Sequence, residues 1–140
     1  MKNALFVVIF SVFASAASAQ SGIKFEHESW KNIIAKAKSE KKLVFLDAYT
    51  SWCGPCKAMQ ARVFPEKTLG DFFNVNFVNA KVDMEQGEGP ALANRYPIQG
   101  YPTLLFIDPN SGKIVTQVLG YQTTEQLLQL GMKANSKKKI

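Results

Sequence analysis

The stretch Trp52-Cys53-Gly54-Pro55-Cys56-Lys57 contains both cysteines of the chain. It follows the apolar run Leu43-Val44-Phe45-Leu46 and opens a segment with the pattern of a helix. A continuous apolar run is typical of a strand that is buried on both faces of a sheet. The two cysteines therefore form a self-contained pair at the point where a buried strand gives way to a helix.

The first 19 residues have the pattern of a secretory signal peptide. Lys2 gives a positive start, residues 4–14 are almost wholly apolar, and Ala17-Ser18-Ala19 fits a small-x-small cleavage site. The apolar stretch is shorter than the roughly 18 to 20 residues that span a bilayer, which argues against an uncleaved membrane anchor. We expect cleavage between Ala19 and Gln20, a periplasmic or secreted protein, and no stable membrane insertion after cleavage.

The spacing of the cysteines argues against a structural cross-link. Cysteines of exported proteins usually pair as structural disulfides. A bridge across only two residues closes almost no loop, however, so it removes little entropy from the unfolded chain. A reactive role for Cys53 and Cys56 is the better interpretation.

The helix that starts at the pair assigns the two roles. Unpaired backbone N–H groups and the positive end of the helix dipole favour the Cys53 thiolate, so we expect its pKa near neutrality rather than at the ~8.5 of a free cysteine. Cys56 lies one turn further in, within bonding reach of Cys53 and more buried. We therefore predict that Cys53 attacks a client disulfide and Cys56 resolves the mixed disulfide. Pro55 fits the first turn without losing a hydrogen bond, and Gly54 leaves room for a partner's backbone.

Asp47 interrupts the buried strand six residues before Cys53. Burial raises the pKa of a carboxyl group, which can then accept or return the proton of the inner thiol. The alternative is a structural aspartate that bonds the backbone or Lys81. A metal site is not expected, because zinc needs three or four ligands and His27, interpreted as a surface residue, is the only histidine. No nucleotide or flavin motif is present, so no cofactor is expected.

The hydrophobic patterns predict an α/β fold with a mixed central β-sheet flanked by helices on both faces. One domain would cover residues 20–132. The expected elements are a helix over His27–Lys42, a strand over Leu43–Tyr49, helices over Cys53–Phe64 and Glu66–Phe73, a strand over Phe77–Val82, a helix over Pro90–Tyr96, a hairpin of strands Thr103–Asp108 and Ile114–Leu119, and a helix from Thr124 that is capped by Thr123 or Thr124.

Residues 133–140 form a basic C-terminal tail within a chain of formal net charge +6. A lysine cluster of this kind can indicate contact with nucleic acid or with a membrane. No arginine or aromatic pattern accompanies these lysines. We therefore interpret residues 133–140 as a solvated, frayed tail and expect no nucleic-acid partner.

Four motifs in order resemble the thioredoxin superfamily. They are the cysteine motif itself, Asp47 at the buried aspartate, Lys81 at its lysine partner, and Tyr101-Pro102-Thr103 at the cis-proline motif, with Gly120 after the last strand. The resemblance implies a thioredoxin fold and a cis Pro102 that faces the cysteine pair. It implies that clients bind beside Trp52, Gly54, Pro55, Tyr101 and Pro102, and that Asp47 and Lys81 assist catalysis.

The chain also departs from thioredoxins. It lacks the kinking proline near Ala61, and Tyr49-Thr50-Ser51 replaces the usual triplet before the cysteine motif. The leading helix and the segment Met84-Glu85-Gln86 are more similar to exported thioredoxin-like proteins and to the periplasmic reductant-delivery domain of the DsbD type. These features leave the client and the direction of electron flow open.

The sequence therefore predicts an exported thiol-disulfide oxidoreductase, most simply a protein-disulfide reductase, that acts on disulfide-bearing protein clients as a monomer. A separate thiol donor, such as a membrane reductase, must reduce it again, because the chain has no third cysteine. The alternatives are a disulfide oxidase or isomerase, and a non-catalytic protein that only binds clients.

Overall fold

The computed structural model describes residues 21–140, so the predicted signal peptide and its cleavage site lie outside the described residues. A four-stranded sheet in the order β2-β1-β3-β4 forms the centre. β1 (Leu43–Tyr49) runs parallel to β2 (Phe77–Asp83) and antiparallel to β3 (Thr103–Ile107), which pairs antiparallel with β4 (Ile114–Leu119). The mixed sheet that the sequence predicted is confirmed.

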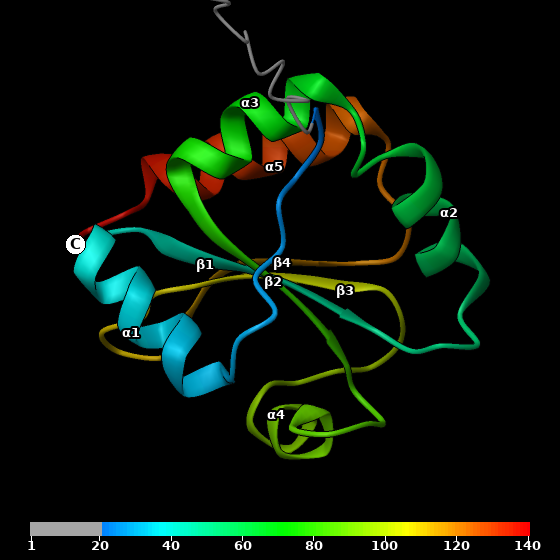
Figure 1. Cartoon of the computed structure of the whole chain (residues 1–140), viewed down its shortest axis with the longest axis horizontal. Helices are drawn as coiled ribbons and strands as arrows, with labels where there is room; N and C mark the ends of the chain where they lie inside the picture. Colours follow the sequence, from blue (N-terminus) through cyan, green and yellow to red (C-terminus); the bar gives the residue numbers. More distant parts are fainter. Residues whose placement is uncertain (1–20) are drawn as a thin grey trace, which may run out of the picture.

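Helices cover both faces of this sheet (Figure 1). The helices α2 (Gly54–Arg62), α3 (Lys67–Asn76) and α5 (Thr124–Ser136) pack over one face, and α1 (Trp30–Glu40) and α4 (Gly89–Arg95) pack over the other. A hydrophobic core lies on each face of the sheet, and alternate residues of β1 point into one or the other. Phe45 packs beneath α2, α3 and α5, whereas Val44 and Leu46 pack against α1 and α4. β1 is therefore buried on both sides, as its apolar sequence predicted.

Helix ends differ from the predicted bounds by a few residues. α1 begins at Trp30 rather than His27, because the side chain of Ser29 accepts a hydrogen bond of 3.3 Å from the backbone N–H of Asn32 and caps the helix. α2 ends at Arg62 rather than Phe64, and α3 continues to Asn76, beyond the predicted end. His27 is exposed, as predicted.

Residues 21–26 form an extended segment that the sequence did not predict. The backbone N–H of Ile23 donates to the carbonyl of Phe64 at 2.8 Å, and that of Glu26 donates to the carbonyl of Asn79 at 2.8 Å. The segment lies so close to α3 that a Cβ on Gly70 would stand 2.3 Å from the carbonyl oxygen of Ser21. Glycine at position 70 therefore lets this segment dock against α3 and along the outer edge of β2.

The C-terminal boundary predicted at residue 132 is too early. α5 continues to Ser136, so Lys133 belongs to its last turn rather than to a tail. Within residues 21–140 we find no helix of the length and apolar character that crossing a membrane requires.

Candidate active site

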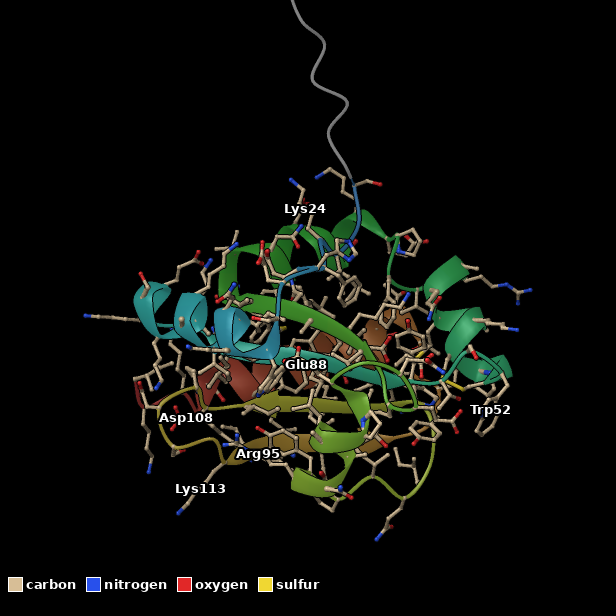
Figure 2. The ribbon with its side chains drawn as sticks, turned by 60° about the horizontal axis from the view of Figure 1, so that its bottom comes forward. Lys24, Trp52, Glu88, Arg95, Asp108 and Lys113 are labelled. Carbon is tan, nitrogen blue, oxygen red and sulfur yellow. A yellow bond between two sulfur atoms is a disulfide. The ribbon has the colours of Figure 1, made fainter. Side chains whose placement is uncertain are left out.

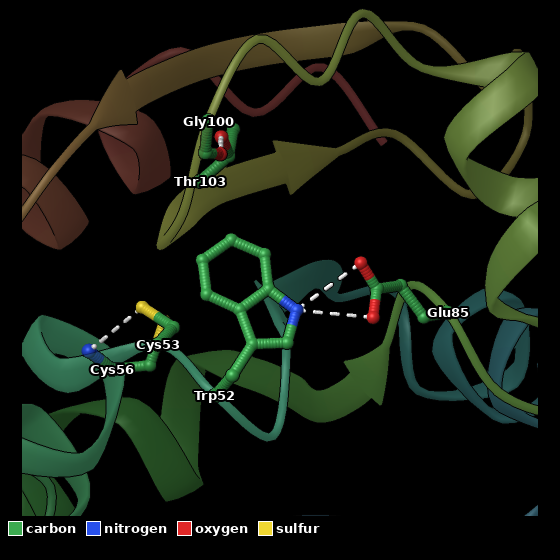
Figure 3. The surroundings of a disulfide bond; sticks show 6 residues. All are labelled: Trp52, Cys53, Cys56, Glu85, Gly100 and Thr103. Atoms are coloured by element: carbon green, nitrogen blue, oxygen red, sulfur yellow. Dashed lines mark hydrogen bonds between the residues drawn. A yellow bond between two sulfur atoms is a disulfide. The ribbon is translucent and has the colours of Figure 1, made fainter.

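Cys53 and Cys56 form a disulfide at the start of α2, with their Cα atoms 5.3 Å apart. Cys53 is the N-cap residue of α2, and its Sγ accepts a hydrogen bond of 3.1 Å from the backbone N–H of Cys56 (Figure 3). Pro55 stands in the first turn, where the missing N–H costs nothing. The helix start that the sequence predicted at Cys53 is confirmed, and the backbone N–H of Cys56 in its first turn points toward the Cys53 sulfur.

Both cysteines are buried, and Cys56 is the more buried of the two, as predicted. Cys53 is 3% exposed and Cys56 is 1% exposed in the disulfide form. The neighbouring Gly54 and Pro55 are exposed, and the side chain of Trp52 is 64% exposed. Trp52, Gly54 and Pro55 therefore form an exposed surface around a nearly covered disulfide.

Trp52 is held in place by two residues from distant loops. Its ring meets the ring of Tyr101 edge to face, with 5.9 Å between the centroids. Its indole N–H donates to the carboxylate of Glu85, at 3.2 Å and 3.1 Å from the two oxygens (Figure 3). Sequence reasoning missed this role of Glu85, because the two residues stand 33 positions apart and no periodic pattern links them.

The peptide bond between Tyr101 and Pro102 is cis, as the resemblance implied. Pro102 is buried, and its carbonyl accepts a hydrogen bond of 2.8 Å from the backbone N–H of Gly120. The hydroxyl of Thr103 donates to the carbonyl of Gly100 at 2.7 Å. These bonds fix the loop that carries Tyr101 against Trp52.

Asp47 lies on the sheet face that α2 covers and is 1% exposed. Burial raises the pKa of its carboxyl group to about 7, although the nearby charge of Lys81 opposes this shift. Neither carboxylate oxygen has a hydrogen-bond partner among residues 21–140. An unpartnered, desolvated carboxyl group that gains and loses its proton near neutrality is suited to proton transfer.

Lys81 is the register partner of Asp47 on β2. It forms no ion pair with Asp47 in the described structure; instead its ammonium group lies over the ring of Tyr49, 4.9 Å from the centroid. Burial lowers the pKa of Lys81, and the charge of Asp47 opposes that shift. The two groups influence each other through space, and a cation–π contact positions the lysine.

No cluster of three or more histidine, cysteine or acidic side chains that could hold a metal ion is found in residues 21–140. The lack of a metal or cofactor stays a prediction.

A family model described as a thioredoxin-like domain matches residues 30–135. The chain belongs to the thioredoxin-like family. A solved structure of a candidate disulphide-isomerase from Bacteroides thetaiotaomicron is 43% identical, covers 80% of this chain and 94% of its own, and superimposes with a TM-score of 0.69. The fold and the disulfide pair are thus those of thiol-disulfide oxidoreductases.

Two curated relatives match shorter stretches. Thioredoxin-1 of Drosophila melanogaster is 36% identical over 72 residues, which are 51% of this chain and 63% of that protein. The thiol:disulfide interchange protein DsbD of Tatumella citrea is 30% identical over 94 residues, which are 66% of this chain and 16% of that protein. This thioredoxin-like chain thus spans less than two thirds of these relatives.

Proposed function

We propose that this chain is an exported protein-disulfide reductase that works through Cys53 and Cys56. The observation that carries the proposal is the position of Cys53 as N-cap of α2, with its sulfur accepting the Cys56 N–H at 3.1 Å. The same N–H and the helix dipole stabilise negative charge on that sulfur when the pair is reduced.

The reaction starts from the reduced pair. The Cys53 thiolate attacks one sulfur of a client disulfide, which forms a mixed disulfide and releases the other client sulfur as a thiolate. The Cys56 thiol then loses its proton and attacks Cys53, which releases the second client sulfur and restores the Cys53–Cys56 disulfide. Two electrons pass to the client, and a separate thiol donor, such as a membrane reductase, must return them.

Asp47 and Lys81 are assigned to the proton of Cys56. Because the pKa of Asp47 is about 7, its carboxylate is available as a base at and above neutral pH. We expect Asp47→Asn to slow resolution of the mixed disulfide by about 100-fold and to remove an inflection near pH 7. The rate is followed as release of a thiol from a preformed mixed disulfide between pH 5 and 9. An unchanged inflection would contradict this role.

Client recognition is assigned to Trp52, Gly54, Pro55, Tyr101 and Pro102. The first three are exposed around the disulfide, and the edge-to-face contact of Trp52 with Tyr101 brings the cis-proline loop to the same surface. An extended client segment that pairs beside Pro102 would place its disulfide over Cys53.

Activity is tested by reduction of insulin with dithiothreitol as electron donor. The parent chain is expected to accelerate reduction, and Cys53→Ser is expected to abolish the acceleration. In cell extracts, Cys56→Ser should accumulate mixed disulfides with physiological clients, because nothing resolves them. A chain that only binds clients would trap none, and its biological activity would survive Cys53→Ser.

An isomerase is the second candidate, favoured by the 43% identical Bacteroides protein. Equilibration with glutathione separates the two. A potential near the roughly −270 mV of thioredoxins supports the reductase, whereas a potential near −180 mV or above supports an isomerase or oxidase. The Gly-Pro pair between the cysteines resembles reducing thioredoxins and favours the first outcome.

Export and the monomeric state belong to the same proposal. Expression of the full chain in a bacterium, followed by N-terminal sequencing of the periplasmic fraction, should give a chain that starts at Gln20. Recovery of the uncleaved chain from the cytoplasm would contradict export.

A further inference from the structure

The positive charge of the chain is concentrated at the end of the sheet opposite the disulfide. β1 leads toward Cys53, so its first residue, Leu43, marks the other end. The end of α1, the turn between β3 and β4, and the C-terminus lie at this end. Figure 1 shows the C-terminus beside α1 and far from α2, and Figure 2 shows Asp108 and Lys113 at the opposite end from Trp52.

We name this region the basic pole and define it by seven lysines: Lys38, Lys41, Lys42, Lys113, Lys137, Lys138 and Lys139. The same segments contain two acidic residues, Glu40 and Asp108. Of the seven lysines, Lys42 is the one that forms an ion pair within residues 21–140, at 2.8 Å from Glu40. A large uncompensated positive charge therefore faces solvent at the basic pole.

Lys137 and Lys138 are held by hydrogen bonds, which contradicts the interpretation of a frayed tail at these positions. The backbone N–H groups of Lys137 and Lys138 donate to the carbonyls of Ala134 and Asn135, at 3.1 Å and 3.2 Å. The ammonium group of Lys138 donates to the carbonyl of Lys41 at 3.1 Å. Ile140 packs against the core. The end of α5 and the end of α1 therefore present their lysines as one surface.

The composition of the basic pole favours a diffuse anionic surface over nucleic acid. Seven of its cations are lysines, which act as compact point charges, and one arginine, Arg95 of α4, reaches it beside Gly112 in the turn between β3 and β4. The chain's other arginine, Arg62, belongs to α2, outside the basic pole. No aromatic residue for base stacking occurs in the segments that define the pole.

Two exposed apolar side chains occur where α3 and α5 end near the basic pole. Val75 is 67% exposed and Met132 is 54% exposed. Each lies within one helical turn of the hydrogen bond between Asn76 and Asn135, which joins the ends of the two helices at 3.1 Å. Lysines together with exposed apolar side chains are characteristic of surfaces that bind the interface of an anionic membrane.

We propose that the basic pole binds the surface of a bilayer that contains anionic phospholipids, with the disulfide directed away from the lipid. Such binding would keep the chain at a membrane without any spanning segment, while Cys53 and Trp52 stay open to soluble partners. The inference does not depend on the direction of electron transfer.

The test is co-sedimentation of residues 20–140 with vesicles of phosphatidylcholine alone or with about one third phosphatidylglycerol. The leader is left out because an apolar leader would itself bind lipid. Binding is expected to anionic vesicles alone and to disappear between about 0.02 M and 0.5 M salt, because salt screens exposed charges. No binding to anionic vesicles at low salt would overturn the proposal.

Two triple variants with equal loss of charge locate the surface. Lys137→Gln/Lys138→Gln/Lys139→Gln should weaken vesicle binding by about 100-fold, since each lysine near an anionic surface contributes about a factor of five. The control Lys57→Gln/Arg62→Gln/Lys67→Gln changes three cations on α2 and at the start of α3, outside the basic pole, and should bind nearly as the parent does. Equal losses in both variants would mean general charge attraction and would overturn the proposal.

Two further measurements separate lipid binding from other causes. Insulin reduction should be unchanged in the 137–139 variant, which shows that its fold and its disulfide are intact. Val75→Ser/Met132→Ser should weaken vesicle binding while retention on a heparin column is unchanged. Retention on heparin without vesicle binding by the parent would identify a polyanion instead of a membrane and would overturn the proposal.

Discussion

The carboxyl group of Asp47 is buried in the protein and has no hydrogen-bond partner in the described structure. Burial raises its pKa from 3.8 to about 7, so its ionised form is disfavoured in the folded protein. The folded state therefore holds a proton that the unfolded state releases above about pH 4. The contribution of this carboxyl group to the free energy of unfolding is therefore largest at low pH, and it is lost as the pH rises through about 7.

Asp47→Asn should consequently stabilise the oxidised protein at pH 8. A shift of about three pKa units corresponds to about 4 kcal/mol, which is an upper bound for the gain in the free energy of unfolding. The gain should be small near pH 4, where the carboxyl group is protonated in the folded state and only about half ionised in the unfolded state. Urea unfolding at pH 4, 6 and 8 measures it.

The control for this prediction is Asp71→Asn. Asp71 pairs with Lys67 at 2.6 Å on the surface of α3, and both side chains are more than half exposed. Its replacement should change the stability by less than about 1 kcal/mol at any of these pH values. Equal effects of the two substitutions, or no gain from Asp47→Asn at pH 8, would contradict the prediction. Either result would show that ionisation of Asp47 does not destabilise the folded protein.

We expect Glu85 to affect client recognition through the orientation of Trp52. Glu85→Ala removes the acceptor of the indole N–H and should raise the KM for insulin by about 3- to 10-fold with kcat nearly unchanged, as expected for one lost hydrogen bond. Glu85→Gln keeps an oxygen acceptor and should restore most of the loss. If both variants raise KM equally, the charge of Glu85 matters and the hydrogen bond does not.

At the scale of elements, helix caps decide where the helices begin. Cys53 caps α2 with sulfur, and Thr123 caps α5 with its hydroxyl, which accepts from the backbone N–H of Gln126 at 3.2 Å. The side chain of Gln126 accepts in return from the backbone N–H of Thr123 at 2.9 Å. This reciprocal pair fixes where α5 starts, and the buried side chains of Leu127 and Ala134 pack the helix against the sheet.

The sequence left Thr123 and Thr124 as equal candidates for this cap, and the structure selects Thr123. Thr123→Ala should lower the free energy of unfolding by about 1 kcal/mol, because a cap and its orphan N–H group are lost. Thr124→Ala, inside the first turn, should change it by less than about 0.5 kcal/mol. Urea unfolding at pH 6 compares the variants, and a larger loss from Thr124→Ala would contradict the assignment.

At the scale of the whole molecule, the mixed character of the sheet could be predicted from the sequence, because it follows from local patterns. The apolar run of β1 gave its bounds, Leu43–Tyr49, and the alternation followed by a hairpin gave the mixed sheet. Contacts between distant segments were not accessible. The bond between Trp52 and Glu85, the docking of residues 21–26 and the contact of Lys138 with Lys41 have no periodic signal, because each depends on where the finished fold places its loops and ends.

The docking of residues 21–26 has a consequence for assembly. The edge strands of the sheet are β2 and β4, and an uncovered edge strand can pair with another chain. Glu26 makes a parallel bridge to Ala80, and the side chain of Asn79 donates to the carbonyl of Lys24 at 3.2 Å, so this segment shields part of β2. We therefore expect the covered protein to be a monomer.

A chain that begins at His27 should associate, whereas a chain that begins at Ser21 should stay monomeric over the same range of concentration in analytical ultracentrifugation. Glu26→Pro is the milder variant, because proline removes the N–H that donates to Asn79 and leaves the rest of the segment in place. It should raise the tendency to associate without unfolding the domain, as circular dichroism can check. If both variants are folded and monomeric at every concentration, the segment serves packing against α3 and does not protect the edge of the sheet.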